Sequence, residues 1–218
     1  MIECIVCKSK IIDVFQIINN LTYWQCDYCS AKFLDKKNYV DLEIEKKHYL
    51  KHNNFIKDIG YRKFLSKLLI PLKKYIFLSD SGLDYGCGYG PALVEMLKEE
   101  GYKIECYDPI FFPNKEIFLK KYQYITCSEV VEHFFNPYEE FNKIDNILDN
   151  NGWFGVMTSF ITEDHLFKDW YYRRDPTHVV FYNEQTFQVI AKQRNWDFII
   201  PCKNVVLFNK KVSKIKFH

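Results

Sequence analysis

Three glycines at every second position stand in the segment Leu83-Asp-Tyr-Gly-Cys-Gly-Tyr-Gly90, near the middle of the chain. Glycine lets the backbone approach a ligand closely, because no Cβ stands in the way. The apolar residues before the turn predict a short buried strand, and Pro91 with the apolar pattern over 92–100 predicts a helix. The N-terminus of that helix would direct unpaired N–H groups at the same place. The segment therefore predicts a cofactor-binding turn. Its candidate contacts are Asp84, Tyr85, Gly86, Cys87 and Gly88.

Two acidic residues indicate which cofactor the turn would bind. A carboxylate at Asp84, directly before the glycines, would repel a pyrophosphate but suits a ligand that carries an ammonium group. Asp108 follows a second strand-like run, 103–107, where its carboxylate can accept hydrogen bonds from ribose hydroxyls. The nicotinamide fingerprint G-x-G-x-x-G has a different spacing. One acid for a cation and one for a ribose favour S-adenosylmethionine over NAD.

An acidic residue followed by G-x-G-x-G resembles the first motif of the class I S-adenosylmethionine-dependent methyltransferases, and the resemblance extends over about residues 82–198. It implies an α/β fold with a Rossmann-like sheet, parallel except for one antiparallel strand. It also implies S-adenosylmethionine as the methyl donor and S-adenosylhomocysteine as the product. Asp84 would lie near the methionine ammonium group and Asp108 on the ribose, with the loop that begins at Pro109 beside the adenine. A plain glycine-rich turn is the alternative interpretation.

The segment after Asp108 departs from the pattern of this family. Only residues 114–123 separate the loop 109–113 from the next strand-like run, 124–128, and no aspartate follows an apolar run there. The third strand is therefore expected to be short or missing, and no adenine-binding residue is assigned.

Polar residues follow the predicted strand 124–128 and resemble a segment of many small-molecule methyltransferases. Ser128 and Glu129 would lie beside the cofactor, at the edge where open α/β sheets bind ligands. His133 has two interpretations: a general base near the transferred methyl group, or a structural residue that hydrogen-bonds Glu129 or Glu132. The structural interpretation is favoured for His133.

A segment dense in aromatic and basic residues, 163–181, follows the strand predicted at 153–158. Such content in a connecting segment suggests function more than the same content in a core. His178 is the best candidate for a group that faces the substrate, against a structural hydrogen-bonding role. Tyr172 and its neighbours could recognise a substrate or form an aromatic lid.

Four cysteines near the N-terminus have the spacing of a zinc site. Cys4 and Cys7 form one C-x2-C pair, and Cys26 and Cys29 form a second pair after 18 residues. Strands predicted at 11–18 and 21–24, with a turn at Asn19-Asn20, complete a zinc ribbon. Four thiolates leave no open position on the metal, so the site would be structural. Two disulfides or a chance spacing are the rival interpretations.

Lysines alternate with aromatic residues between 31 and 79, which makes the first third of the chain basic. Such a pattern can indicate RNA binding, but it more often belongs to a helix that buries its apolar side. A helix is expected over Phe55–Leu72, with Tyr49 and Tyr61 as candidates to contact the cofactor.

Composition and length fit a globular chain with one main domain and a small module. The expected division is a zinc ribbon (1–35), a helical lead-in (36–79) and a methyltransferase domain (80–218). A basic, apolar leader and a membrane-spanning run are not expected, and eight cysteines suggest a reducing compartment, so the expected location is cytoplasmic. The expected function is methyl transfer to a small-molecule acceptor. An RNA methyltransferase and a non-catalytic cofactor-binding or scaffold protein are the alternatives.

Overall fold

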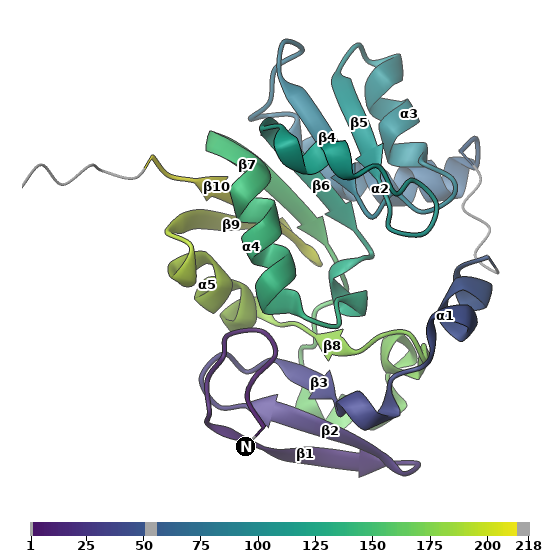
Figure 1. Ribbon diagram of the computed structural model, residues 1–218, viewed down its shortest axis with the longest axis vertical. Coiled ribbons are helices and arrows are strands. Elements are labelled where there is room, and N and C mark those ends of the chain that lie inside the picture. Colours follow the sequence, from purple (N-terminus) through teal and green to yellow (C-terminus); the bar gives the residue numbers. More distant parts are fainter. Residues whose placement is uncertain (1, 51–55, 213–218) are drawn as a thin grey trace, which may run out of the picture.

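Two β-sheets organise the chain (Figure 1). The computed structural model describes residues 2–50 and 56–212. The larger sheet has six strands in the order β5-β4-β6-β7-β10-β9, and the smaller has four in the order β1-β2-β3-β8.

The six-stranded sheet has the expected α/β architecture. In sequence order its strands are β4 (Ser81–Tyr85), β5 (Lys103–Tyr107), β6 (Tyr122–Ser128), β7 (Leu148–Met157), β9 (Trp196–Cys202) and β10 (Val205–Lys210). β4, β5, β6 and β7 pair in parallel, whereas β10 lies antiparallel between β7 and β9. The predicted fold class, a mostly parallel Rossmann-like sheet with one antiparallel strand, is confirmed.

Helices cover both faces of this sheet (Figure 1). α2 (Ile59–Leu72) and α3 (Ala92–Glu99) share one apolar cluster with Tyr124, Val205 and Leu207 of the strands. α4 (Pro137–Ile147) and α5 (Glu184–Gln193) pack on Phe154 and Phe208 within the other cluster. α5 begins with a capping box, in which Asn183 and Thr186 satisfy each other's backbone N–H groups. No described helix is long and apolar enough to cross a membrane.

The boundary between α4 and β7 differs from the expectation. The sequence predicts a strand over 153–158, but α4 ends at Ile147 and the strand already begins at Leu148. Leu148 is fully buried and pairs with Tyr122 of β6. Burial in the sheet therefore outweighs the local turn signal of the Asn-Asn-Gly sequence.

The expected loss of the third strand is confirmed. A 3₁₀ turn, η2 (Lys115–Leu119), connects β5 to β6, and β5 is the edge strand of the described sheet. Asn114 caps the turn by accepting a hydrogen bond from Glu116 N–H, and Ile117 anchors it in the core.

The N-terminal part forms the predicted hairpin and then pairs with a strand from later in the chain. β1 (Ile12–Ile18) and β2 (Leu21–Cys26) meet at Asn19 and Asn20, whose φ angles of 51° and 65° are those of a type I′ turn. β3 (Lys32–Leu34) pairs with β2 on one side and with β8 (Val180–Phe181) on the other. The small sheet therefore takes its fourth strand from the distant end of the chain.

A short helix, α1 (Leu42–Tyr49), follows this sheet and is capped by the Asp41 side chain. The side chain of Tyr49 and residue Phe55, both named by the sequence expectations, lie outside the described part of the chain. The proposed domain boundaries stay a prediction.

A substitution at Gly82 of β4 would test the packing of the sheet. A Cβ at this position would overlap the ring of Tyr124, a fully buried residue whose hydroxyl donates to Lys103 O. We expect Gly82→Ala to lower the free energy of unfolding by about 1–3 kcal/mol in urea denaturation, because the ring cannot move without breaking this bond. Gly60→Ala, on the exposed side of α2, should be neutral or stabilising. Equal stability of the two variants would contradict the packing described.

Candidate functional site

The turn after β4 requires its first glycine. Gly86 has a φ of +85°, and its N–H donates to Tyr107 O over 2.7 Å. A Cβ there would lie 2.5 Å from Cγ1 of Val130. Both the backbone conformation and the contact with Val130 exclude larger residues.

Gly88 keeps an open approach to the backbone of the same turn. Its φ is +63°, and a Cβ built on it would meet no described heavy atom within 4 Å. Its N–H donates to Oδ2 of Asp108 over 3.1 Å, which ties the turn after β4 to the end of β5. The turn thus presents bare backbone to a volume that a ligand could occupy.

Asp108 is a buried carboxylate held by backbone groups. Oδ1 accepts hydrogen bonds from the N–H groups of Ile110 (2.8 Å) and Phe111 (3.0 Å), in addition to the bond from Gly88 to Oδ2. A carboxylate has about four acceptor positions, so Oδ2 keeps one for a hydroxyl. Pro109, the first residue of the loop, is exposed. The sequence placed Asp108 and Pro109 in one ligand-binding region, and the structure brings them to the same edge of the sheet.

Asp84 lies at the end of β4 and is almost fully buried. It accepts a hydrogen bond from Thr126 Oγ1 over 2.7 Å, and burial raises its pKa to about 7 despite this bond. The charge of Asp108 raises the pKa further. A cationic ligand group beside Asp84 would relieve the cost of ionising it.

Tyr61, Ser128 and Glu129 complete the edge around these aspartates. Burial raises the pKa of the Tyr61 hydroxyl, and the nearby charges of Asp84 and Glu129 raise it further, so α2 brings this tyrosine to the strand ends. The Oγ atom of Ser128 is buried and has no hydrogen-bond partner among the described residues. Glu129 has a φ of +54°, and its N–H donates to Met157 O over 2.7 Å.

The Glu129 carboxyl group is shifted toward its neutral form. Burial, followed by the charge of Glu132, raises its pKa to about 9, while a hydrogen bond from Tyr172 and the charge of Lys67 oppose the shift. Neutral and ionised carboxylates can therefore lie together at this edge.

The side chains of two predicted cofactor contacts, Tyr85 and Cys87, make contacts within the protein. The hydroxyl of Tyr85 donates to Oε2 of Glu140 on α4 over 2.6 Å, and its ring packs 5.2 Å from that of Tyr107. Cys87 Sγ lies 3.5 Å from Gly88 O, and burial raises the pKa of this thiol. Their backbone atoms, but not the Tyr85 side chain, belong to the turn.

The three side chains predicted to be catalytic lie together. The rings of His133 and His178 are 4.7 Å apart, and those of Tyr172 and His178 are 4.2 Å apart, measured between centroids. His133 belongs to the turn η3 (Val131–His133) after β6, whereas Tyr172 belongs to η5 (Tyr171–Arg174), beyond β7. The structure therefore brings together two turns that lie far apart in the sequence.

Glu132 and Thr158 complete this cluster, although sequence reasoning did not propose them as site residues. Glu132 is fully buried, and its Oε2 accepts a hydrogen bond from Thr158 Oγ1 over 2.9 Å. Thr158 Oγ1 also lies 2.9 Å from the Tyr172 hydroxyl. The sequence signal for Glu132 is its position directly before His133, which indicates a hydrogen-bond partner for that ring but not a site residue.

A pocket of about 230 Å³ is lined in part by His178. It lies between the hairpin and the segment 173–178, where Arg173 donates to the Tyr23 hydroxyl over 3.2 Å. Its wall consists of Asn19, Leu21, Tyr23, Leu34, Asn38, Val40, Arg173, Arg174, Asp175, Pro176 and His178.

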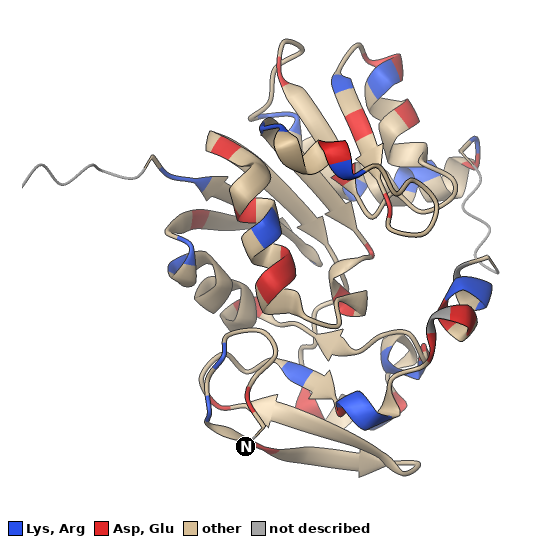
Figure 2. Cartoon of the chain, viewed as in Figure 1, with Lys and Arg blue, Asp and Glu red and all other residues tan. Residues whose placement is uncertain are grey.

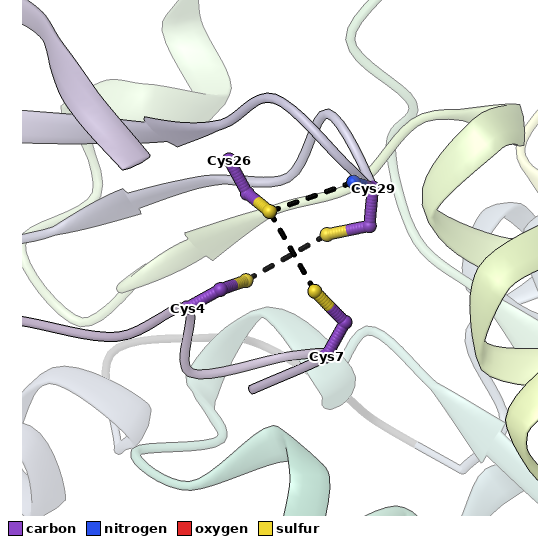
Figure 3. Close-up of side chains that lie close together, drawn as sticks. All are labelled: Cys4, Cys7, Cys26 and Cys29. Atoms are coloured by element: carbon purple, nitrogen blue, oxygen red, sulfur yellow. Dashed lines mark hydrogen bonds between the residues drawn. The ribbon is translucent and has the colours of Figure 1, made fainter. Parts of the chain in front are cut away.

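The four N-terminal cysteines converge on one point (Figure 3). Sγ of Cys4 lies 3.6 Å from Sγ of Cys29, and Sγ of Cys7 lies 3.6 Å from Sγ of Cys26. These distances are far longer than the roughly 2.05 Å of a disulfide. Thiolates about 2.3 Å from a tetrahedral zinc ion would be roughly 3.8 Å apart, so the donor set fits zinc.

The raised pKa of Asp84 predicts a pH-dependent stability. The folded pKa of about 7 lies above the unfolded value of 3.8. The contribution of Asp84 to the free energy of unfolding is therefore fully present below pH 3.8 and is lost as the pH rises through 7. The measurement is the free energy of unfolding in urea without cofactor. The value for Asp84→Asn minus that for the wild type should increase by roughly 2 kcal/mol from pH 5 to pH 8. Glu105→Gln, at a more exposed acid on β5, should show no such trend. A constant difference between Asp84→Asn and wild type would refute the assignment.

Comparisons with known proteins agree with the fold described above. A family model described as a methyltransferase domain matches residues 57–199, about two thirds of the chain. A SAM-dependent methyltransferase from Archaeoglobus fulgidus shares the fold, with 15% identity and a TM-score of 0.53 over 78% of this chain and 100% of that one. An O-methyltransferase family protein from Burkholderia thailandensis has 11% identity and a TM-score of 0.50 over 73% and 62%, respectively. No curated protein matches in sequence. The chain belongs to the methyltransferase domain family.

Proposed function

We propose that the protein transfers a methyl group from S-adenosylmethionine to a small-molecule acceptor. The observation that carries this proposal is the pair of buried aspartates at the ends of adjacent strands, Asp84 on β4 and Asp108 after β5. Their different environments suit an ammonium group and a ribose hydroxyl of one ligand.

The residues at the edge of the sheet fit S-adenosylmethionine. Gly86 and Gly88 would lie along its methionine part and Asp84 near its ammonium group, with Asp108 on the ribose. Gly88 offers the open approach, and Ser128 offers a buried hydroxyl that lacks a partner among the described residues. Tyr61 and Glu129 would close the site from α2 and from the end of β6. The cofactor would supply a methyl group on a sulfonium, which is an excellent leaving group.

Positioning of the acceptor and removal of its proton would then be the work of the protein. Nδ1 of His178 lies 2.7 Å from Tyr172 O, so in the neutral ring this nitrogen carries the proton and its N–H donates a hydrogen bond to the carbonyl. Nε2 of the ring then has its lone pair available to accept a proton. His178, with Tyr172 and His133 beside it, is our candidate for the group that faces the substrate.

Size and charge favour a small acceptor over RNA. The pocket beside His178, at about 230 Å³, suits part of a metabolite. Acidic and basic residues occur together on α1 and on α3 (Figure 2). Several lysines are also paired: Lys32 with Asp164, Lys73 with Glu100 and Lys120 with Glu105, each within 2.8 Å. Paired charges contribute little to the binding of a phosphate backbone.

We also infer that the four cysteines bind a structural zinc ion. The inference rests on their burial and on the sulfur–sulfur distances. The backbone around the cysteines is hydrogen-bonded to α5: Thr186 Oγ1 donates to Cys29 O and Gln193 Nε2 donates to Cys7 O, both over 2.9 Å. The reduced thiols that zinc requires fit the cytoplasm.

Titration with S-adenosylhomocysteine tests the proposed cofactor. We expect micromolar binding by calorimetry, and we expect Asp108→Ala to weaken it by ~1–3 kcal/mol, as for a lost charged hydrogen bond. Glu105→Ala removes an acid from the same strand and should leave binding unchanged.

Two outcomes would count against the proposal. Equal binding by wild type and Asp108→Ala would remove Asp108 from the site. Failure of the folded wild type to bind would indicate that the missing third strand has eliminated the adenine site, and a scaffold role would then replace catalysis.

Metal analysis tests the zinc site. We expect one zinc per chain by mass spectrometry, and we expect Cys26→Ser to lose it and to lower the melting temperature by roughly 10 °C. A single melting transition is expected, because the ribbon and α5 share one apolar cluster. Cys202→Ser, at an exposed cysteine, is the matched control. Zinc retained at full occupancy by Cys26→Ser would exclude the site.

A further inference from the structure

The cluster beside the proposed cofactor site has the donors of a second metal site. The carboxylate of Glu132 and the imidazoles of His133 and His178 place one ligand atom each within 4.8 Å of one another. We propose that these three residues bind a divalent metal cation, distinct from the zinc held by the four cysteines.

Both imidazoles are oriented by hydrogen bonds to backbone carbonyls. Nδ1 of His133 lies 3.1 Å from Thr177 O, and Nδ1 of His178 lies 2.7 Å from Tyr172 O. A carbonyl can only accept, so each Nδ1 carries a proton, and each neutral ring keeps its lone pair on Nε2. Histidine ligands of metals are typically fixed in this way by the nitrogen that does not bind the metal.

Glu132 supplies the negative charge of the site. Its side chain is fully buried, and one oxygen, Oε2, is held by Thr158 Oγ1 over 2.9 Å. The other oxygen, Oε1, is buried without a hydrogen-bond partner among the described residues and lies 3.9 Å from Nε2 of His133. A cation beside this carboxyl group would stabilise its ionised form, whose charge is costly to leave uncompensated in a buried position. The competing explanation is an ion pair between Glu132 and protonated histidines.

A second carboxylate, that of Asp175, also lies near His178. Its Oδ2 lies 3.8 Å from Nε2 of His178 but only 2.9 Å from Nε2 of His48, and its Oδ1 accepts from Thr177 N–H over 2.9 Å. Asp175 is therefore engaged mainly by His48 and Thr177.

Two imidazole nitrogens and one carboxylate oxygen suit cations such as Mn²⁺, Fe²⁺, Co²⁺ or Zn²⁺ better than Ca²⁺. Three protein ligands leave open coordination positions. His178 also lines the pocket of about 230 Å³. If the proposed methyl transfer is correct, the metal would take the Nε2 lone pair of His178, so this ring would no longer act as the base. An acceptor oxygen at an open position of the metal would become more acidic and would pass its proton to water.

Manganese distinguishes the two metal sites. Mn²⁺ favours oxygen and nitrogen ligands, whereas four thiolates retain zinc. With zinc-loaded full-length protein and no cofactor, we expect Mn²⁺ titration followed by electron paramagnetic resonance to show one bound equivalent. Pulsed measurements on the bound ion should detect the nitrogen nuclei of two imidazoles.

Substitutions assign the ligands. Glu132→Gln and His178→Gln should each weaken Mn²⁺ binding at least tenfold, while zinc content stays at one per chain. The control is His165→Gln with Glu163→Gln, an exposed histidine–glutamate pair 3.4 Å apart, which should leave Mn²⁺ binding unchanged. Because a variant at the buried Glu132 could misfold, the nitrogen coupling in the wild type provides a test that needs no substitution.

Three results would overturn the proposal. The first is that neither Mn²⁺ nor a second equivalent of Zn²⁺ binds the wild type. The second is that the bound Mn²⁺ shows no coupling to histidine nitrogen, and the third is that folded Glu132→Gln and His178→Gln bind Mn²⁺ as tightly as the control. The first would leave the ion pair between Glu132 and the histidines as the explanation. S-adenosylhomocysteine titration of the same samples separates failure of the metal site from failure of the proposed function.

Discussion

Desolvation of carboxylates is the constraint on which the functional edge of the sheet depends. Asp84, Asp108 and Glu132 are all buried at the ends of β4, β5 and β6, and Glu129 lies beside them. Their hydrogen bonds come from two kinds of donor. Backbone N–H groups satisfy Asp108, a threonine hydroxyl bonds Asp84, and Thr158 bonds one oxygen of Glu132. The raised pKa values of Asp84 and Glu129 show that this compensation is incomplete without ligands.

The proposed ligands would complete the compensation in two places. An ammonium group would lie by Asp84, and a metal cation would lie by Glu132. Tyr172 links Glu132 with Glu129, because its hydroxyl lies beside Thr158, which bonds Glu132, and its hydrogen bond opposes the raised pKa of Glu129. Changes at Glu132 are therefore expected to be felt at Glu129 through a short chain of hydrogen bonds.

Local patterns in the sequence were sufficient to predict much of the fold and part of the site. The glycine turn, the edge position of β5, the hairpin turn at Asn19-Asn20 and the cysteine spacing are all determined by neighbouring residues. The proximity of His133 to His178 could not be predicted, because it depends on where the segment 163–179 packs. The orientation of Tyr85 toward Glu140 and the start of β7 at Leu148 were missed for the same reason. Tertiary contacts decided these features, and one sequence does not record them.

The pairing of β3 with β8 has a consequence for synthesis of the chain. Lys32 and Phe33 lie opposite Phe181 and Val180, so the small sheet joins residues about 150 positions apart. On the ribosome, the hairpin emerges long before its last strand is made, and β3 must present an unpaired edge in the meantime. Folding of this N-terminal part is thus completed only after Val180 and Phe181 have been synthesised. A metal captured early by the four cysteines would hold β2 and the first turn together during that wait.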